Sequence, residues 1–111
     1  MRVKTKAEHE NDRTQILRLL VEVGFHPITP ATILSVMDES FHSLSAESLD
    51  FHLRFMADKG WIEVGEEKRP GQAPALLYAK LTAMGVEEYD RRCREVTGYR
   101  GQGTGRKAQV S

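Results

Sequence analysis

The stretch LRFMADKGWIEVGEEKRPGQAPALLYAKLT, residues 53–82, decides the expected fold. It opens inside a run of apolar side chains at helical spacing, in which Leu49, Leu53 and Met56 lie on one stripe. Gly60 follows that stripe, and glycine is a typical residue for ending a helix. We therefore expect a helix that stops at Gly60 and leads directly into the next element.

Two short strands are predicted after this helix. Residues 61–64 alternate between apolar and polar side chains, and residues 76–81 form the returning strand. Residues 65–74 hold two glycines and two prolines, which predicts a long polar loop between the strands. The pair is expected to form an antiparallel β-hairpin with an extended tip.

The rest of the chain predicts mostly helices, at about 11–23, 30–38, 45–59 and 82–96. The first helix carries its apolar residues at the i, i+3, i+4, i+7 spacing of a buried face, and Gly24 stops it. Pro27 and Pro30 interrupt any helix between them, so an extended stretch is expected near Ile28. The last helix is expected to stop at Gly98 and to bury one face: Val86, Tyr89, Cys93 and Val96.

A chain of 111 residues is expected to form one domain. We place it at residues 9–97, between a flexible basic N-terminus (1–8) and a disordered, basic, glycine-rich tail (98–111). No apolar run is long enough to span a bilayer and no signal peptide is evident, so a cytoplasmic protein is expected.

The order helix, short strand, helix, helix, hairpin, helix resembles the winged helix-turn-helix fold. Residues 53–62 look like the family segment in which the recognition helix ends at glycine and enters the first strand of the hairpin, called the wing. The far end of the wing, about 61–81, matches the Y-x-x-L-T-x-x-G pattern of winged-helix transcriptional regulators such as the PadR and MarR groups, at Tyr78, Leu81, Thr82 and Gly85. One departure is the turn at residues 39–44, which is longer than the standard one.

The resemblance implies a regulator that binds double-stranded DNA without catalysis, with the third helix in the major groove and the wing on phosphates. The solvent side of the third helix is expected to present Ser45, Glu47, Ser48, Asp50, His52 and Arg54. Of these, Ser45, Glu47, Ser48 and His52 are the candidate DNA contacts. Glu47 has a second interpretation, favoured here, in which it complements the helix dipole.

Lys68 and Arg69, near the tip of the wing, are candidate phosphate contacts. Glu66 and Glu67 beside them weaken the positive electrostatic potential of the tip. Further positive charge lies at the C-terminal end, at Arg91, Arg92, Arg94, Arg100, Arg106 and Lys107. Two interpretations of that end stay open: a mobile basic arm for phosphates, or a solubilising tail.

The charge distribution argues against DNA. The net charge is zero, and residues 7–90 hold 7 basic and 15 acidic groups between basic ends. The alternative is therefore a protein–protein interaction module that uses the acidic face of the third helix. A homodimer through the first and last helices is expected in the DNA-binding case. The target sequence and any effector stay open.

No enzymatic constellation, cofactor or metal site is predicted. The four histidines, His9, His26, His42 and His52, do not stand at a recognised metal-ligand spacing, and His42 and His52 are expected to be polar surface residues even if they are neighbours. Cys93 is the only cysteine and is expected to be buried on the apolar face of its helix, with a redox role as the minor alternative.

Overall fold

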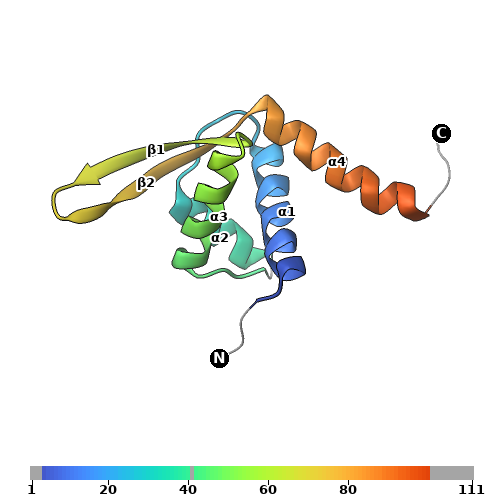
Figure 1. Cartoon of the computed structure of the whole chain (residues 1–111), viewed down its shortest axis with the longest axis horizontal. Helices are drawn as coiled ribbons and strands as arrows, with labels where there is room; N and C mark the ends of the chain where they lie inside the picture. Colours follow the sequence, from blue (N-terminus) through green and yellow to red (C-terminus); the bar gives the residue numbers. More distant parts are fainter. Residues whose placement is uncertain (1–3, 41, 101–111) are drawn as a thin grey trace.

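The computed structural model describes residues 4–40 and 42–100, with side chains up to residue 95. The elements follow one another as α1 (Lys6–Val23), α2 (Pro30–Glu39), α3 (Ala46–Asp58), β1 (Ile62–Arg69), β2 (Gln72–Leu81) and α4 (Ala83–Arg100). Figure 1 shows α1, α2 and α3 packed side by side, with the hairpin projecting on one side of this body and α4 on the other. Among the described residues, no helix combines the length and the apolar character needed to cross a membrane.

Polar caps set the starts of the first three helices. Thr29 accepts a hydrogen bond from the Thr32 amide ahead of Pro30, and Ser45 accepts one from the Ser48 amide, as the sequence predicts. α1 begins at Lys6, earlier than its apolar pattern indicates, because Thr5 and Glu8 form a reciprocal capping box.

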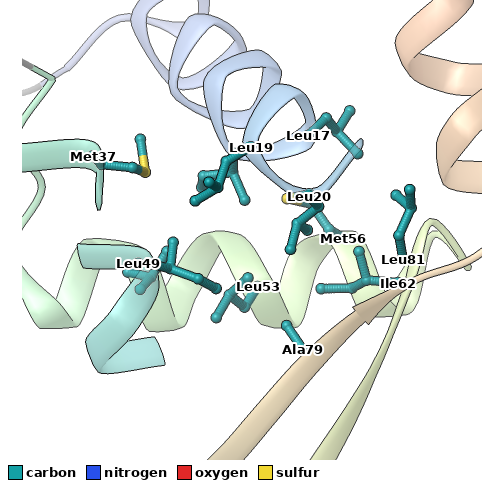
Figure 2. Packing of buried hydrophobic residues seen from close by; sticks show 12 residues of the cluster. Leu17, Leu19, Leu20, Met37, Leu49, Leu53, Met56, Ile62, Ala79 and Leu81 are labelled. Atoms are coloured by element: carbon teal, nitrogen blue, oxygen red, sulfur yellow. The ribbon is translucent and has the colours of Figure 1, made fainter. Parts of the chain in front are cut away.

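The core lies where α1, α3 and the base of the hairpin meet. Figure 2 shows Leu17 and Leu20 of α1 facing Met56 of α3, with Ile62 and Leu81 of the hairpin closing one end. All five side chains are at most 3% exposed. The full set of buried hydrophobic residues is Ile16, Leu17, Leu19, Leu20, Ile33, Met37, Leu49, Leu53, Met56, Ile62, Ala79 and Leu81.

The hairpin is longer than the sequence predicts. Residues 65–74, expected as a loop, are largely strand, and the turn is confined to Pro70 and Gly71. Gly71 has a φ of 72°, which suits the third residue of a tight turn after proline. Register shifts at Gly65/Glu66 and between Glu67 and Arg69 absorb the irregular sequence as β-bulges.

A single bridge adds a third segment to the base of the wing. The amide of Ile28 donates to the Ala79 carbonyl at 2.9 Å, and the Ala79 amide donates back at 2.8 Å. This confirms the extended stretch predicted near Ile28, and it fixes the α1–α2 connection to β2.

Thr82 joins the wing to α4. Its hydroxyl donates to the Gly60 carbonyl at 2.7 Å and accepts from the Gly85 amide at 3.1 Å. The expected stop of α4 at Gly98 is wrong, since the helix continues to Arg100. The expected burial of Cys93 is also wrong, because its side chain is exposed.

The predicted apolar face of α4 is shorter than expected. Val86 and Tyr89 pack against the core. The face ends there because α4 extends away from the body, as Figure 1 shows, and the Cys93 side chain further along the helix is exposed. The Val96 side chain lies outside the described residues.

Candidate nucleic-acid interface

The start of α3 presents the residues expected to face DNA. Ser45 and Glu47 are exposed, and Ser48 is half-buried. The Ser45 hydroxyl accepts from the Ser48 amide at 3.0 Å, so this hydroxyl also caps the helix. Glu47 lies in the first turn, where a carboxylate complements the positive end of the helix dipole.

His52 is a correction to the predicted interface. Its side chain is fully buried, so it cannot face solvent or a base from α3. Helical geometry turns it towards α1, where its Nδ1 accepts a hydrogen bond from Arg13 Nε at 3.2 Å. Burial and the nearby Arg13 charge lower the pKa of His52, which keeps the ring neutral near pH 7.

His42 is held by a hydrogen bond to Asp12 rather than being free on the surface. Its Nε2 lies 2.8 Å from Asp12 Oδ1, and Asp12 also approaches His52. The expectation that His42 and His52 are polar surface residues is therefore wrong for His52. The sequence carries one local signal, because His52 lies three residues after Leu49 and four before Met56 on the buried stripe of α3. Its partners at residues 9–12 and 42 meet it only when α1 and α3 pack together.

Arg54 connects α3 to both strands of the wing. Its guanidinium donates to Asp50 at 2.8 Å, to Glu66 at 2.7 Å and to the Pro74 carbonyl at 2.7 Å. The hydrogen bonds that Arg54 donates to Asp50 and then to Glu66 raise the Arg54 pKa further above its ordinary value, so the group stays charged. Asp50 is neutralised by the same contact, which lowers the acidic character of the α3 face.

The wing tip carries the predicted basic residues in the open. Lys68 and Arg69 are both exposed next to the turn. Arg69 forms a salt bridge with Glu67, whose carboxylate lies 3.1 Å from Arg69 Nη2. Lys68 has no salt bridge within the part of the chain that is described here, so it carries the least compensated charge of the tip.

Three of the candidate arm residues lie in the described part of α4. Arg91, Arg92 and Arg94 lie within the helix, and the first two are paired with carboxylates. Arg91 contacts Glu88 and Glu95. The Arg100 side chain and residues 106 and 107 lie outside the described residues.

Arg92 holds α4 against α1. It is 10% exposed, contacts Glu88 at 2.7 Å and Glu10 at 2.8 Å, and donates to the Thr14 hydroxyl at 2.8 Å. Burial by itself raises the pKa of Glu10, but the Arg92 charge and hydrogen bond outweigh it and the net shift is downward. Arg92 therefore stabilises the packing of α4 on α1, and its contacts leave it unavailable to phosphate.

Solved structures with this arrangement are transcriptional regulators. The chain is similar to a PadR-like transcription factor from Bacteroides fragilis, at 15% identity and a TM-score of 0.68, over 85% of this chain and 87% of that one. A PadR family transcriptional regulator from Eggerthella lenta matches at 14% identity and a TM-score of 0.60, over 81% and 80%. A transcriptional regulator from Clostridium thermocellum matches at 16% identity and a TM-score of 0.63, over 88% and 91%.

These likenesses confirm the winged helix-turn-helix fold, mostly α with a small antiparallel hairpin. A scan against protein-family models gives no match, and a search of curated proteins gives none either. The fold exposes the start of α3 and the basic tip of the wing, and Arg54 links α3 to both strands of the wing.

Proposed function

We propose that this chain is a non-catalytic transcriptional regulator that binds double-stranded DNA, with α3 in the major groove and the wing on phosphates. The observation that carries the proposal is the Arg54 contact, which fixes the exposed start of α3 relative to Lys68 and Arg69. The regulators that share the fold support the same assignment. Ser45, Glu47 and Ser48 are the candidate contacts to DNA bases. His52 is not one of them, because its side chain is buried.

The two surfaces have different roles in this proposal. Lys68 and Arg69 supply contacts to phosphate, which position the protein on any duplex. Serine hydroxyls can donate or accept at base edges, and a carboxylate such as Glu47 accepts from the cytosine amino group. Sequence preference therefore arises at α3, while the wing contributes affinity that depends on salt.

The test is binding to a mixed-sequence duplex, measured by fluorescence anisotropy at several salt concentrations. We expect affinity to fall steeply as salt rises, and Lys68→Ala to weaken binding on all sequences and reduce the salt slope by about one. Lys59→Ala is the matched control, because Lys59 is an exposed cation at the C-cap of α3, before the wing begins and outside the proposed dimer helices. A flat salt dependence, or no binding at low salt, would refute the proposal.

Selection of bound sequences from random DNA, with a pull-down in parallel, separates DNA from a protein partner. The acidic face of α3 was the reason to consider a protein, but Arg54 already neutralises Asp50 on that face. We expect a consensus to emerge from the selection and to be lost in Glu47→Gln if that carboxylate reads a base. Enrichment of one protein without any DNA consensus would favour the interaction module instead.

The proposal includes a homodimer formed through α1 and α4, acting in the cytoplasm. α4 projects from the body in Figure 1 and packs on α1 along its first half, which leaves its remaining length for a second copy. A two-fold axis there presents two α3 helices to a symmetric DNA site. Native mass spectrometry at micromolar protein should give a dimer, and a monomer alone would remove this part.

A further inference from the structure

Three potential metal ligands meet inside the body, between α1 and α3. His9 and Asp12 come from adjacent turns of α1, and His52 comes from α3. One ligand atom from each lies within 4.8 Å of the others. Asp12 is 4% exposed and His52 is fully buried, so the cluster is enclosed rather than spread over a surface.

Two ring nitrogens of this cluster are buried without a hydrogen-bond partner among the described residues: His9 Nδ1 and His52 Nε2. His52 Nε2 lies 3.4 Å from Asp12 Oδ2, close enough for attraction but without hydrogen-bond geometry. A buried polar atom with no partner loses its hydration without compensation, so such atoms normally have an explanation. A bound cation would satisfy both nitrogens at once.

We propose that His9, Asp12 and His52 form a binding site for a divalent transition metal of the zinc class. Two imidazoles and one carboxylate are a ligand set that suits Zn²⁺, Cu²⁺ or Ni²⁺, whereas Mg²⁺ and Ca²⁺ take oxygen ligands. The site joins α1 to α3 independently of whether α3 binds DNA.

The ligand atoms must close up slightly around an ion. Zinc bonds nitrogen at about 2.0–2.1 Å, which sets ligand atoms roughly 3.4 Å apart in a tetrahedron. The widest ligand separation, within 4.8 Å here, therefore shortens by up to about 1.4 Å on binding, a change within the reach of side-chain rotation. The fourth position is left to water, since His42 Nε2 contacts Asp12 Oδ1 at 2.8 Å but is not one of the three ligands that meet within 4.8 Å.

Two cations now occupy the positions that the metal would compete for. Lys4 Nζ lies 2.6 Å from Asp12 Oδ2 and has to leave that oxygen. Arg13 Nε donates to His52 Nδ1, whereas coordination through Nε2 places the ring proton on Nδ1. Arg13 can release the ring without losing its place, since Glu10 at 2.6 Å and the Phe55 ring at 3.6 Å also hold it.

The test uses the full chain, freed of metal with a chelator, and titrates it with Zn²⁺ by calorimetry and with Co²⁺ by visible absorption. We expect one ion per chain and the visible bands of Co²⁺ in a low-symmetry nitrogen and oxygen site. His9→Gln should weaken binding by about tenfold or more, because one of three protein ligands is lost. His26→Gln is the matched control, since His26 is an exposed histidine outside the cluster and should bind like the wild type.

A measurement on the unaltered chain keeps the proposal testable if a variant misfolds. Histidine ring nitrogen NMR should show that Zn²⁺ shifts His9 and His52, while His26 stays in place. Absence of any Zn²⁺ or Co²⁺ signal with the wild type would overturn the site. So would equal binding by folded His9→Gln, or ring shifts confined to His26.

Discussion

The guanidinium of Arg54 donates a hydrogen bond to Glu66 across 2.7 Å, and this contact ties α3 to β1. The same group reaches the Pro74 carbonyl on β2 at 2.7 Å, so one side chain spans both strands of the hairpin. The angle between α3 and the wing is therefore fixed by a residue that touches neither the core nor the wing tip.

Replacing Arg54 with methionine should separate stability from DNA affinity. The contact is about one third exposed, so its loss should change the free energy of unfolding by less than about 1 kcal/mol. DNA affinity should fall by roughly fivefold, about 1 kcal/mol, because the wing is no longer preorganised against α3. Urea unfolding and anisotropy measure the two effects, with Lys59→Met as control, an exposed cation outside the proposed dimer helices. Equal affinity in both variants would show that Arg54 does not set the interface.

Removing Arg92 should weaken the packing of α4 on α1. Arg92→Met leaves Glu10 and Glu88 without their shared cation at a poorly exposed contact, which should cost about 1–3 kcal/mol in urea unfolding. Arg94→Met is the matched control, since Arg94 is an exposed neighbour on the same helix, and it should change stability by about 0.5 kcal/mol or less. Similar losses of unfolding free energy in the two variants would argue against a specific role for Arg92 in holding α4 on α1.

Gly85 is expected to tolerate no side chain at all. A Cβ on Gly85 would lie 2.1 Å from the Trp61 carbonyl oxygen and 2.7 Å from a methyl of Leu81. Because the first neighbour is backbone, Gly85→Ala should destabilise the fold by about 1–3 kcal/mol or more. Thermal unfolding checks this against Glu87→Ala, an exposed change in the same turn of α4 that should be close to neutral. A melting temperature unchanged by Gly85→Ala would mean that the close approach is not maintained.

Acid should weaken the ion pairs that Glu88 makes with Arg91 and Arg92 on α4. Hydrogen bonds from Arg91, then from Arg92, hold the pKa of Glu88 below its ordinary value of 4.5. A carboxyl whose folded pKa is lowered gives stability that is present above the unfolded pKa and is lost as pH falls through the folded one. The urea midpoint should therefore drop below about pH 4.5, and Glu88→Gln should flatten that part of the profile. A steeper acid loss in Glu88→Gln would contradict this assignment.

The architecture was predictable because its signals are local. Caps at Thr29 and Ser45 and the stop at Gly60 lie next to the elements that they limit, and the structure confirms each of them. The start of α1 was missed because its first turns are polar and carry no apolar period. The length of the hairpin was missed because bulges accommodate Gly65 and Pro74, which composition alone assigns to a loop.

The polar cluster could not be predicted because its members are far apart in sequence. Polarity alone places His52 on the solvent side of α3, although it lies three residues after Leu49 and four before Met56, the spacing of the buried stripe. Arg13 and Asp12 of α1 give it buried polar partners. Placing a residue on the surface because its side chain is polar fails where one buried polar side chain is paired with another. The exposure of Cys93 was missed for a related reason, since the apolar face of α4 outlasts the body that could cover it.

Thr82 has a consequence for how this fold can vary. Its two hydrogen bonds close the hairpin at Gly60 and Gly85, so the helices are joined before the wing begins to project. Residues can then be added or removed near Pro70 and Gly71 without moving the helices. Because strand side chains alternate between faces, lengthening both strands together by two residues preserves which groups point towards α3. The length of the wing can thus change while the body stays the same.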